Sequence, residues 1–207
     1  NPAALEQDPL YQLALAIYQH YQKSVVPQVN YYEKQIAQLQ KEYMKGLMEN
    51  VKTRVFYPDA NGTMRVTYGK ANGYEGKDGV EFKYYTTLDG LVEKNKTGEE
   101  DFYVKPRLLE LYEKKDYGQY ADKKGQLRTA FIGSNHTTGG NSGSPVLNAK
   151  GELIGTNFDR NWEGTMSDIM YNPAFCRNIV LDIHFTLWMV DKYAGAGYLL
   201  NEMKIIK

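Results

Sequence analysis

The sequence predicts a mainly β protein that begins with a helical segment and ends with a helix. Three observations predict this fold class. Apolar residues recur at helical spacing over the first fifty residues, short β-branched and aromatic runs separated by glycine-bearing turns follow from position 55, and a second helical pattern follows Asp182. We therefore expect two parts, the end of a helical domain over 1–54 and a strand-rich domain with a C-terminal helix over 55–207.

The N-terminal part carries two amphipathic patterns. Asp8 followed by Pro9 is a good helix start, and apolar residues then recur at spacings of three and four as far as Tyr21. Pro27 interrupts this pattern, and a second one runs from Val29 and ends near Asn50. Because a proline separates two such patterns, we expect a helical hairpin.

The strand-rich part begins at VFYPDANGTMRVTYGK, where Asn61-Gly62 is a strong turn signal between two β-type segments. Further along, RTAFIG, SPVLN, ELIGTNF and SDIMY are expected to be short strands. A short helix is predicted over 105–115, and a C-terminal helix is predicted to be capped by Asp182 and ended by Gly195.

The composition argues against several classes of function. Lys plus Arg (25) equals Asp plus Glu (25), so no net charge favours nucleic acid or an anionic membrane. The single cysteine rules out an intrachain disulfide and any CxxC site, and no apolar run approaches the ~20 residues of a membrane span. Metal, dinucleotide and nucleotide motifs are missing from the sequence, and we predict no cofactor.

The stretch GGNSGSP, from 139 to 145, contains a candidate nucleophile. A reactive serine needs a tight loop in which backbone N–H groups converge on the developing oxyanion, and a glycine two residues before it allows that approach. Ser142 and Gly140 have this spacing. A Gly- and Ser-rich loop can also be a simple connection. The strand after Pro145, the turn at 149–151 and the next strand favour the catalytic interpretation, because a chymotrypsin-like second barrel continues in this way from its nucleophile.

The segments GGNSGSPVLNAKGELIGTNFDRNWEG, FYPDANGTMRVTYGK and DIHFTLWMVDKYAGA together resemble the bacterial serine dipeptidyl peptidases of the 7 and 11 types. The resemblance covers the whole chain and implies the C-terminal portion of such an enzyme. It implies the end of an inserted α-helical domain, followed by the second barrel of a chymotrypsin-like fold with its C-terminal helix. Members of this family release dipeptides from a free N-terminus.

The resemblance also assigns substrate contacts. An arginine at the position of Arg160 resembles the dipeptidyl peptidase 11 branch, which prefers Asp or Glu at P1, and a guanidinium can grip a carboxylate through two parallel hydrogen bonds. The family role of Asp159 is to bind the substrate α-ammonium, and Phe158 and Asn157 are expected to shape the same pocket. The alternative is a surface Arg160 that pairs with Asp159 or Glu163.

The base is not evident in this chain. We interpret His20, His136 and His184 as structural or solvated residues, and a chymotrypsin-like triad takes its His and Asp from the first barrel, before the serine. The chain starts NPAALEQDPL, without an initiator Met or a signal peptide, which suggests a piece of something longer or a processed product. We therefore expect it to hold the nucleophile half of a composite site and to be inactive alone.

The expected partners follow from the resemblance. They are a peptide substrate and the missing N-terminal barrel of the same polypeptide, with no nucleic acid. The parent is expected to be a homodimer in the periplasm or at the surface of a Gram-negative bacterium. The alternative from a different class is a non-catalytic, protease-like barrel that serves as a binding or assembly module.

Overall fold

The structure is a computed structural model, and it describes residues 5–54, 56 and 62–206. The chain divides into two compact units, Asn1–Asn61 and Gly62–Lys207, which are described separately. The domain boundary is predicted between residues 54 and 55, and residue 55 lies outside the described residues.

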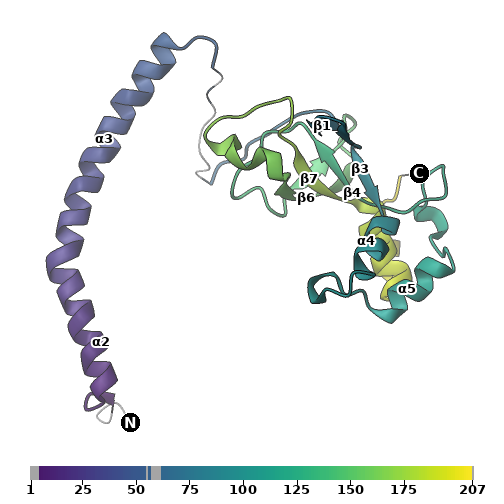
Figure 1. Cartoon of the computed structure of the whole chain (residues 1–207), viewed down its shortest axis with the longest axis horizontal. Coiled ribbons are helices and arrows are strands. Elements are labelled where there is room, and N and C mark those ends of the chain that lie inside the picture. The colour runs from purple at the N-terminus through teal and green to yellow at the C-terminus, as the bar shows by residue number, and fades with distance from the viewer. Residues whose placement is uncertain (1–4, 55, 57–61, 207) are drawn as a thin grey trace. The chain divides into compact units, whose positions relative to one another are not determined.

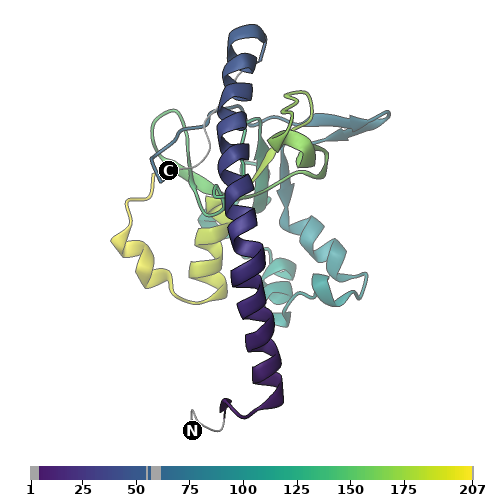
Figure 2. The same cartoon turned by 90° about the vertical axis from the view of Figure 1, so that its left-hand side faces the viewer.

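The first unit is one uninterrupted helical run, so the predicted hairpin is wrong (Figure 2). Helix α2 (Pro9–His20) passes through a π-helical turn (Tyr21–Val25) directly into helix α3 (Val26–Asn50). Asp8 caps α2 as predicted, since its side chain accepts from the N–H of Leu10 and Tyr11.

Pro27 does not break the helix because of the π-helical turn before it. Within a regular α-helix, the proline ring would clash with the carbonyl four residues earlier. Here Pro27 lies in the first turn of α3, and the N–H of Val26 donates to the carbonyl of Tyr21, five residues back. This wider turn accommodates the proline without a change of direction into a hairpin.

The apolar face predicted for this unit is present but uncovered. Neither α2 nor α3 contains a buried residue, and Leu10, Ile17 and Leu39 are each more than 60% exposed. Amphipathic helices gain most of their stability from packing of the apolar face. The stripe is therefore a surface suited to packing against other protein.

The second unit is built on a five-stranded antiparallel sheet with the order β3-β4-β7-β6-β5 (Figure 1). The strands are β3 (Tyr85–Thr87), β4 (Arg128–Gly133), β5 (Pro145–Leu147), β6 (Leu153–Arg160) and β7 (Asn178–Asp182). A separate two-stranded hairpin joins β1 (Tyr74–Lys77) to β2 (Val80–Phe82). The predicted strands RTAFIG, SPVLN and ELIGTNF are thus confirmed as β4, β5 and β6.

Two other strand predictions differ from the structure. SDIMY is not a strand, because its first two residues, Ser167 and Asp168, end a 3-10 helix over Trp162–Asp168 and bond to the side chain of Arg160. The segment 63–70 after the expected Asn61-Gly62 turn is also not a regular strand, and Asn61 itself lies outside the described residues.

Helices gather at one end of the sheet and enclose the core of this unit (Figure 1). They are α4 (Leu88–Asn95), α5 (Pro106–Glu113) and α6 (Ile183–Trp188), with a π-helical turn (Met189–Tyr193) and 3-10 turns at Glu100–Phe102, Gly118–Tyr120 and Gly197–Glu202. Trp188 is fully buried among Leu88, Leu127 and Tyr117, and its indole N–H donates to the carbonyl of Asp116 at 2.8 Å.

The helix predictions for this unit are confirmed. Helix α5 occupies the stretch predicted over 105–115, and Asp182 caps α6 by accepting from the N–H of His184. Gly195 follows the π-helical turn Met189–Tyr193 with a positive φ of 67°, a conformation that favours glycine. The protein therefore combines helices with antiparallel sheet, and the prediction of a mainly β protein is wrong in this respect. The loop between β4 and β5 lies beside β6, since Gly143 donates to the carbonyl of Asn157.

Candidate active site

The loop around Ser142 connects β4 to β5, and its glycines adopt conformations that other residues avoid. Gly140 has a φ of +99° and Gly143 a φ of +83°, both in the left-handed region. Two glycines therefore allow the chain to turn sharply on either side of the serine. Ser142 itself is exposed at this turn.

Three backbone N–H groups of the stretch 139–145 have partners inside the protein. Asn141 donates to the carbonyl of Thr138, Gly143 to that of Asn157 and Ser144 to that of Asn141, at 2.8–3.1 Å. Within the described residues, the N–H groups of Gly140 and Ser142 donate to no protein acceptor. These are the two groups expected to bind an oxyanion, and they are available to do so.

Asn157 holds the serine loop against the sheet. It is 5% exposed, its N–H donates to Ser144 at 2.9 Å, its carbonyl accepts from Gly143, and its side-chain amide donates to the carbonyl of Asn141 at 3.1 Å. Its own side-chain oxygen accepts from Asn178 at 2.9 Å. The structure thus gives Asn157 the contacts of a loop clamp, and its predicted contribution to a pocket wall stays a prediction.

A β-bulge lies next to this clamp. Along β6, Asn157 opposes Val180 and Asp159 opposes Ile179, so Phe158 is the extra residue. Bulges frequently redirect side chains near active sites. The carbonyl of Phe158 accepts a long hydrogen bond of 3.4 Å from Ser142 Oγ, and the residue as a whole is 47% exposed. The bulge therefore brings strand β6 into contact with the candidate nucleophile.

None of the described histidines is bonded to Ser142. The Nε2 of His136 lies 3.1 Å from the carbonyl of Ser167, and its ring packs on Tyr171 with centroids 4.8 Å apart. His184 lies 2.8 Å from Asp182, and this hydrogen bond raises the pKa of the imidazole. His20 belongs to α2 in the other unit. Within the described residues, Ser142 Oγ thus donates to a backbone carbonyl and is hydrogen-bonded to no base.

Arg160, at the end of β6, is held by the 3-10 helix that follows it. Its Nη1 donates to Ser167 Oγ and, at 3.4 Å, to the carbonyl of Gly164, while its Nη2 lies 3.0 Å from Asp168 Oδ1. The side chain is only 17% exposed. The alternative of a surface arginine paired with Asp159 or Glu163 is therefore wrong in its choice of partner.

The two acidic neighbours have other roles. Asp159 is exposed, and its Oδ1 accepts from the backbone N–H of Arg160 at 2.8 Å. Glu163 accepts from the hydroxyl of Tyr74 at 2.7 Å and from the amide of Asn161 at 3.0 Å. An exposed carboxylate beside the serine loop can still bind a substrate ammonium, so the predicted role of Asp159 stays a prediction.

Sequence reasoning missed Asp168 as the partner of Arg160. The only available signal was an acidic residue eight positions further on, and the strand expected at SDIMY concealed it. The amide network from Asn141 through Asn157 to Asn178 was also missed, because it joins three separate segments.

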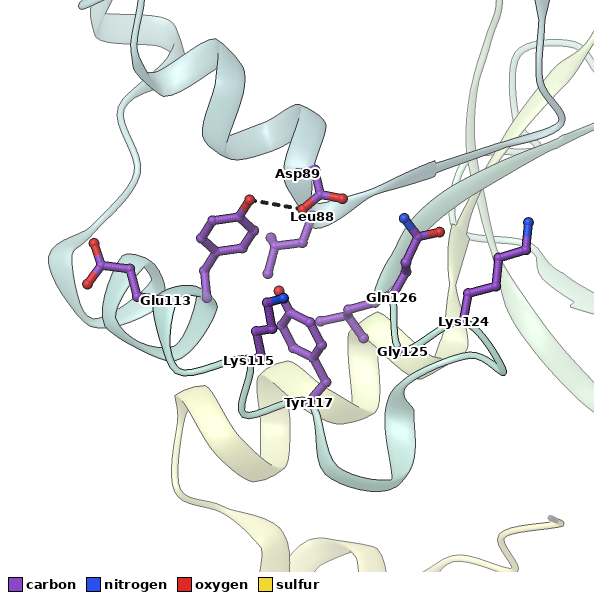
Figure 3. Close-up of a pocket in the computed structure, with 10 residues that line it drawn as sticks. Leu88, Asp89, Glu113, Lys115, Tyr117, Lys124, Gly125 and Gln126 are labelled. Atoms are coloured by element: carbon purple, nitrogen blue, oxygen red, sulfur yellow. Dashed lines mark hydrogen bonds between the residues drawn. The ribbon is translucent and has the colours of Figure 1, made fainter.

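Two cavities in this unit lie away from these residues. One, of about 330 Å³, is lined by α4, the end of α5 and the turn at Gly125 (Figure 3). The hydroxyl of Tyr112, another residue that lines it, donates to Asp89 at 2.9 Å. Burial raises the pKa of Tyr117 in this cavity to about 12. The other, of about 550 Å³, lies beside α4 and α5. The candidate site is therefore defined by the serine loop and β6.

The described residues contain no group of three or more His, Cys, Asp or Glu side chains placed to hold a metal ion. Among the helices in the described ranges, none is long and apolar enough to cross a membrane.

An exposed serine whose own N–H and that of Gly140 have no protein acceptor, next to a strand that ends in a largely buried arginine, is an arrangement suited to acyl transfer from a peptide. The chain belongs to the peptidase S46 family, whose model matches residues 2–205.

Its relatives carry peptidase names. The chain is 48% identical over 199 residues to an Asp/Glu-specific dipeptidyl-peptidase of Flavobacterium psychrophilum, and 46% identical over 169 residues to a dipeptidyl-peptidase 7 of Phocaeicola vulgatus. These matches cover 96% and 82% of the chain but only 28% and 23% of the relatives.

A solved structure agrees with this fold. The chain matches the crystal structure of Porphyromonas endodontalis DPP11 in complex with the dipeptide Arg-Glu, with a TM-score of 0.86 and 42% identity. The match covers 95% of the chain and 28% of that structure. The chain thus spans about a quarter of the length of the relatives it matches.

Proposed function

We propose that this chain is the C-terminal, nucleophile-bearing portion of a serine exopeptidase that releases N-terminal dipeptides with Asp or Glu at P1. The observation that carries this proposal is the pair of unpartnered N–H groups at Gly140 and Ser142, in a loop clamped to the strand that ends in Arg160. The Asp/Glu specificity of the similar dipeptidyl-peptidase of Flavobacterium psychrophilum supports the choice of substrate.

In this proposal Ser142 Oγ attacks the carbonyl carbon of the second peptide bond. The oxyanion that forms accepts from the N–H groups of Gly140 and Ser142, and the serine proton passes to a base outside the described residues. Collapse of the intermediate breaks the peptide bond, and the remaining peptide leaves with a protonated amine. Water then releases the dipeptide and restores the serine.

Substrate selection rests on two charges near the bulge. Arg160 pairs with the P1 carboxylate in S1, while Asp159 binds the α-ammonium of the peptide and so fixes the cut two residues from the amino end. Phe158, which is exposed, borders the same site. The similar crystal structure of Porphyromonas endodontalis DPP11 contains the dipeptide Arg-Glu, so a peptide is the expected ligand here.

The rest of the proposal concerns the parent protein. The sheet and its C-terminal helix form part of the second barrel of a chymotrypsin-like fold, and residues 1–54 are the end of an inserted helical domain, for which the uncovered apolar stripe on α2 and α3 provides a packing surface. A first barrel supplies the missing His and Asp. The parent is a homodimer in the periplasm or at the surface of a Gram-negative bacterium.

The isolated 207-residue chain is expected to be inactive toward dipeptidyl reporter substrates from pH 5 to 9. Its Ser142 hydroxyl contacts the carbonyl of Phe158 and no described base, and an unassisted hydroxyl is a weak nucleophile. Reporter release by the purified chain is compared with release by the same preparation of Ser142→Ala. Turnover that disappears in Ser142→Ala would show that a group in this chain, such as His136, acts as the base.

The full-length protein tests the substrate assignment. Reporters with Glu, Asp, Leu or Lys at P1 and a free N-terminus are compared with acetylated copies. We expect release from the Glu and Asp reporters only, and no release once the amine is blocked. A full-length protein that cleaves none of them but binds other protein would favour the non-catalytic module.

A further inference from the structure

Asp168 is the acidic partner of Arg160, and no role has so far been given to it. Its Oδ1 lies 3.0 Å from Nη2 of Arg160, at the end of the 3-10 helix Trp162–Asp168. The arginine side chain is 17% exposed and the aspartate 54%, so the pair lies at the edge of the site with its charge partly open to solvent.

Asp168 also connects this helix to the serine loop. The hydrogen bond from Arg160 holds the pKa of Asp168 below its usual value, and a weaker contribution comes from a hydrogen bond with the side chain of Thr138. Thr138 is bonded in turn to Asn141, next to Ser142, through its N–H and its carbonyl. The ionised carboxylate thus contacts both the arginine and the loop that carries the serine.

The hydrogen bonds of Arg160 use three of the five N–H groups of its guanidinium. An arginine has five N–H donors, two on each terminal nitrogen and one on Nε. Nη1 uses its donors on Ser167 and Gly164, and Nη2 uses one on Asp168. No described residue accepts from Nε–H. Nε and Nη2 together form an edge that a carboxylate can bind with two parallel bonds, and of this edge only Nη2 has a protein acceptor.

We propose that Asp168 is a positioning residue that binds the far side of the Arg160 guanidinium and thereby presents the Nε/Nη2 edge to the P1 carboxylate. This inference rests on the proposed function. Ser167 and Gly164 hold Nη1 only. Without Asp168, the guanidinium can rotate around Nη1, and the orientation that allows two parallel bonds to the substrate becomes one of several orientations. Asp168 then determines how well an acidic P1 side chain binds, without contacting it.

The test is kinetic and uses the full-length protein. We expect Asp168→Ala to raise KM for Glu- and Asp-P1 reporters about five- to tenfold, with kcat within about twofold of wild type, since one charge-assisted hydrogen bond at a partly exposed site is lost. Asp168→Asn keeps an oxygen acceptor for Nη2 and is expected to restore most of the affinity.

Two further variants separate positioning from a general structural effect. Glu163→Gln removes a charge from the same 3-10 helix, where the carboxylate binds Tyr74 and Asn161, and it should leave KM for acidic substrates unchanged. In an Arg160→Gly background, Asp168→Ala should have no further effect on the ratio of acidic to apolar kcat/KM. Such non-additivity is expected only if Asp168 acts through Arg160.

The outcomes distinguish this inference from the proposed function. If wild type shows no acidic preference, or if Arg160→Gly keeps it, the proposed function fails. If the acidic preference depends on Arg160 but Asp168→Ala leaves KM for acidic reporters unchanged, or lowers kcat for all reporters alike, the positioning role is overturned and the function stands.

Discussion

Ser142→Ala in the full-length protein is expected to abolish dipeptide release and to leave the fold intact. Loss of a triad serine removes most of the catalytic enhancement, so kcat for a Glu-P1 reporter should fall by at least about 10⁴-fold. The hydroxyl makes one long bond to the carbonyl of Phe158, so its removal should hardly change stability. Steady-state kinetics and thermal melting measure the two effects.

Ser144→Ala is the matched control in the same loop. Its backbone holds the loop through Asn141 and Asn157, and these bonds do not involve the side chain. Activity within a few-fold of wild type is expected. If Ser144→Ala were inactive while Ser142→Ala retained kcat, the nucleophile would have to be assigned to the other serine.

Arg160→Gly is expected to reverse the substrate preference. Removal of one partner of a desolvated charge pair costs about 2 to 5 kcal/mol, so kcat/KM for Glu- and Asp-P1 reporters should fall at least about tenfold. The preference for apolar P1 residues should rise, because the pocket no longer contains a guanidinium, which favours a carboxylate over an apolar side chain. Arg160→Lys should rescue poorly, since an ammonium lacks the planar fork.

Asp159→Ala is the internal control for that experiment. Loss of the amine contact should weaken acidic and apolar reporters by similar factors, and leave their ratio unchanged. If Arg160→Gly also lowered both alike, the arginine would serve the fold and not P1 recognition. Its hydrogen bonds to Ser167 and Gly164 make that outcome physically possible, and melting temperatures would reveal it.

Local chemistry explains what could be predicted from the sequence. Asp8 and Asp182 were identified as helix caps because a cap depends on a few neighbouring residues. The glycines around Ser142 were recognisable because positive φ angles favour this residue type. β4, β5 and β6 followed from short β-type runs between turns.

Longer-range features could not be predicted in this way. Pro27 predicts a helix break, because a π-helical turn such as Tyr21–Val25 has no recognisable sequence pattern. The partner of Arg160 depends on how the chain folds back over Trp162–Asp168. The clamp by Asn157 likewise requires the register between β6 and β7, which no local pattern specifies.

The most direct test of the central claim is a crystal structure of full-length Ser142→Ala with a bound peptide that carries Glu at P1. We expect the P1 carboxylate to bind Arg160 on its Nε/Nη2 edge, and the carbonyl oxygen of the second peptide bond to lie within hydrogen-bond distance of the N–H groups of Gly140 and residue 142. A peptide whose P1 carboxylate binds elsewhere, with its carbonyl oxygen away from these two groups, would contradict the account.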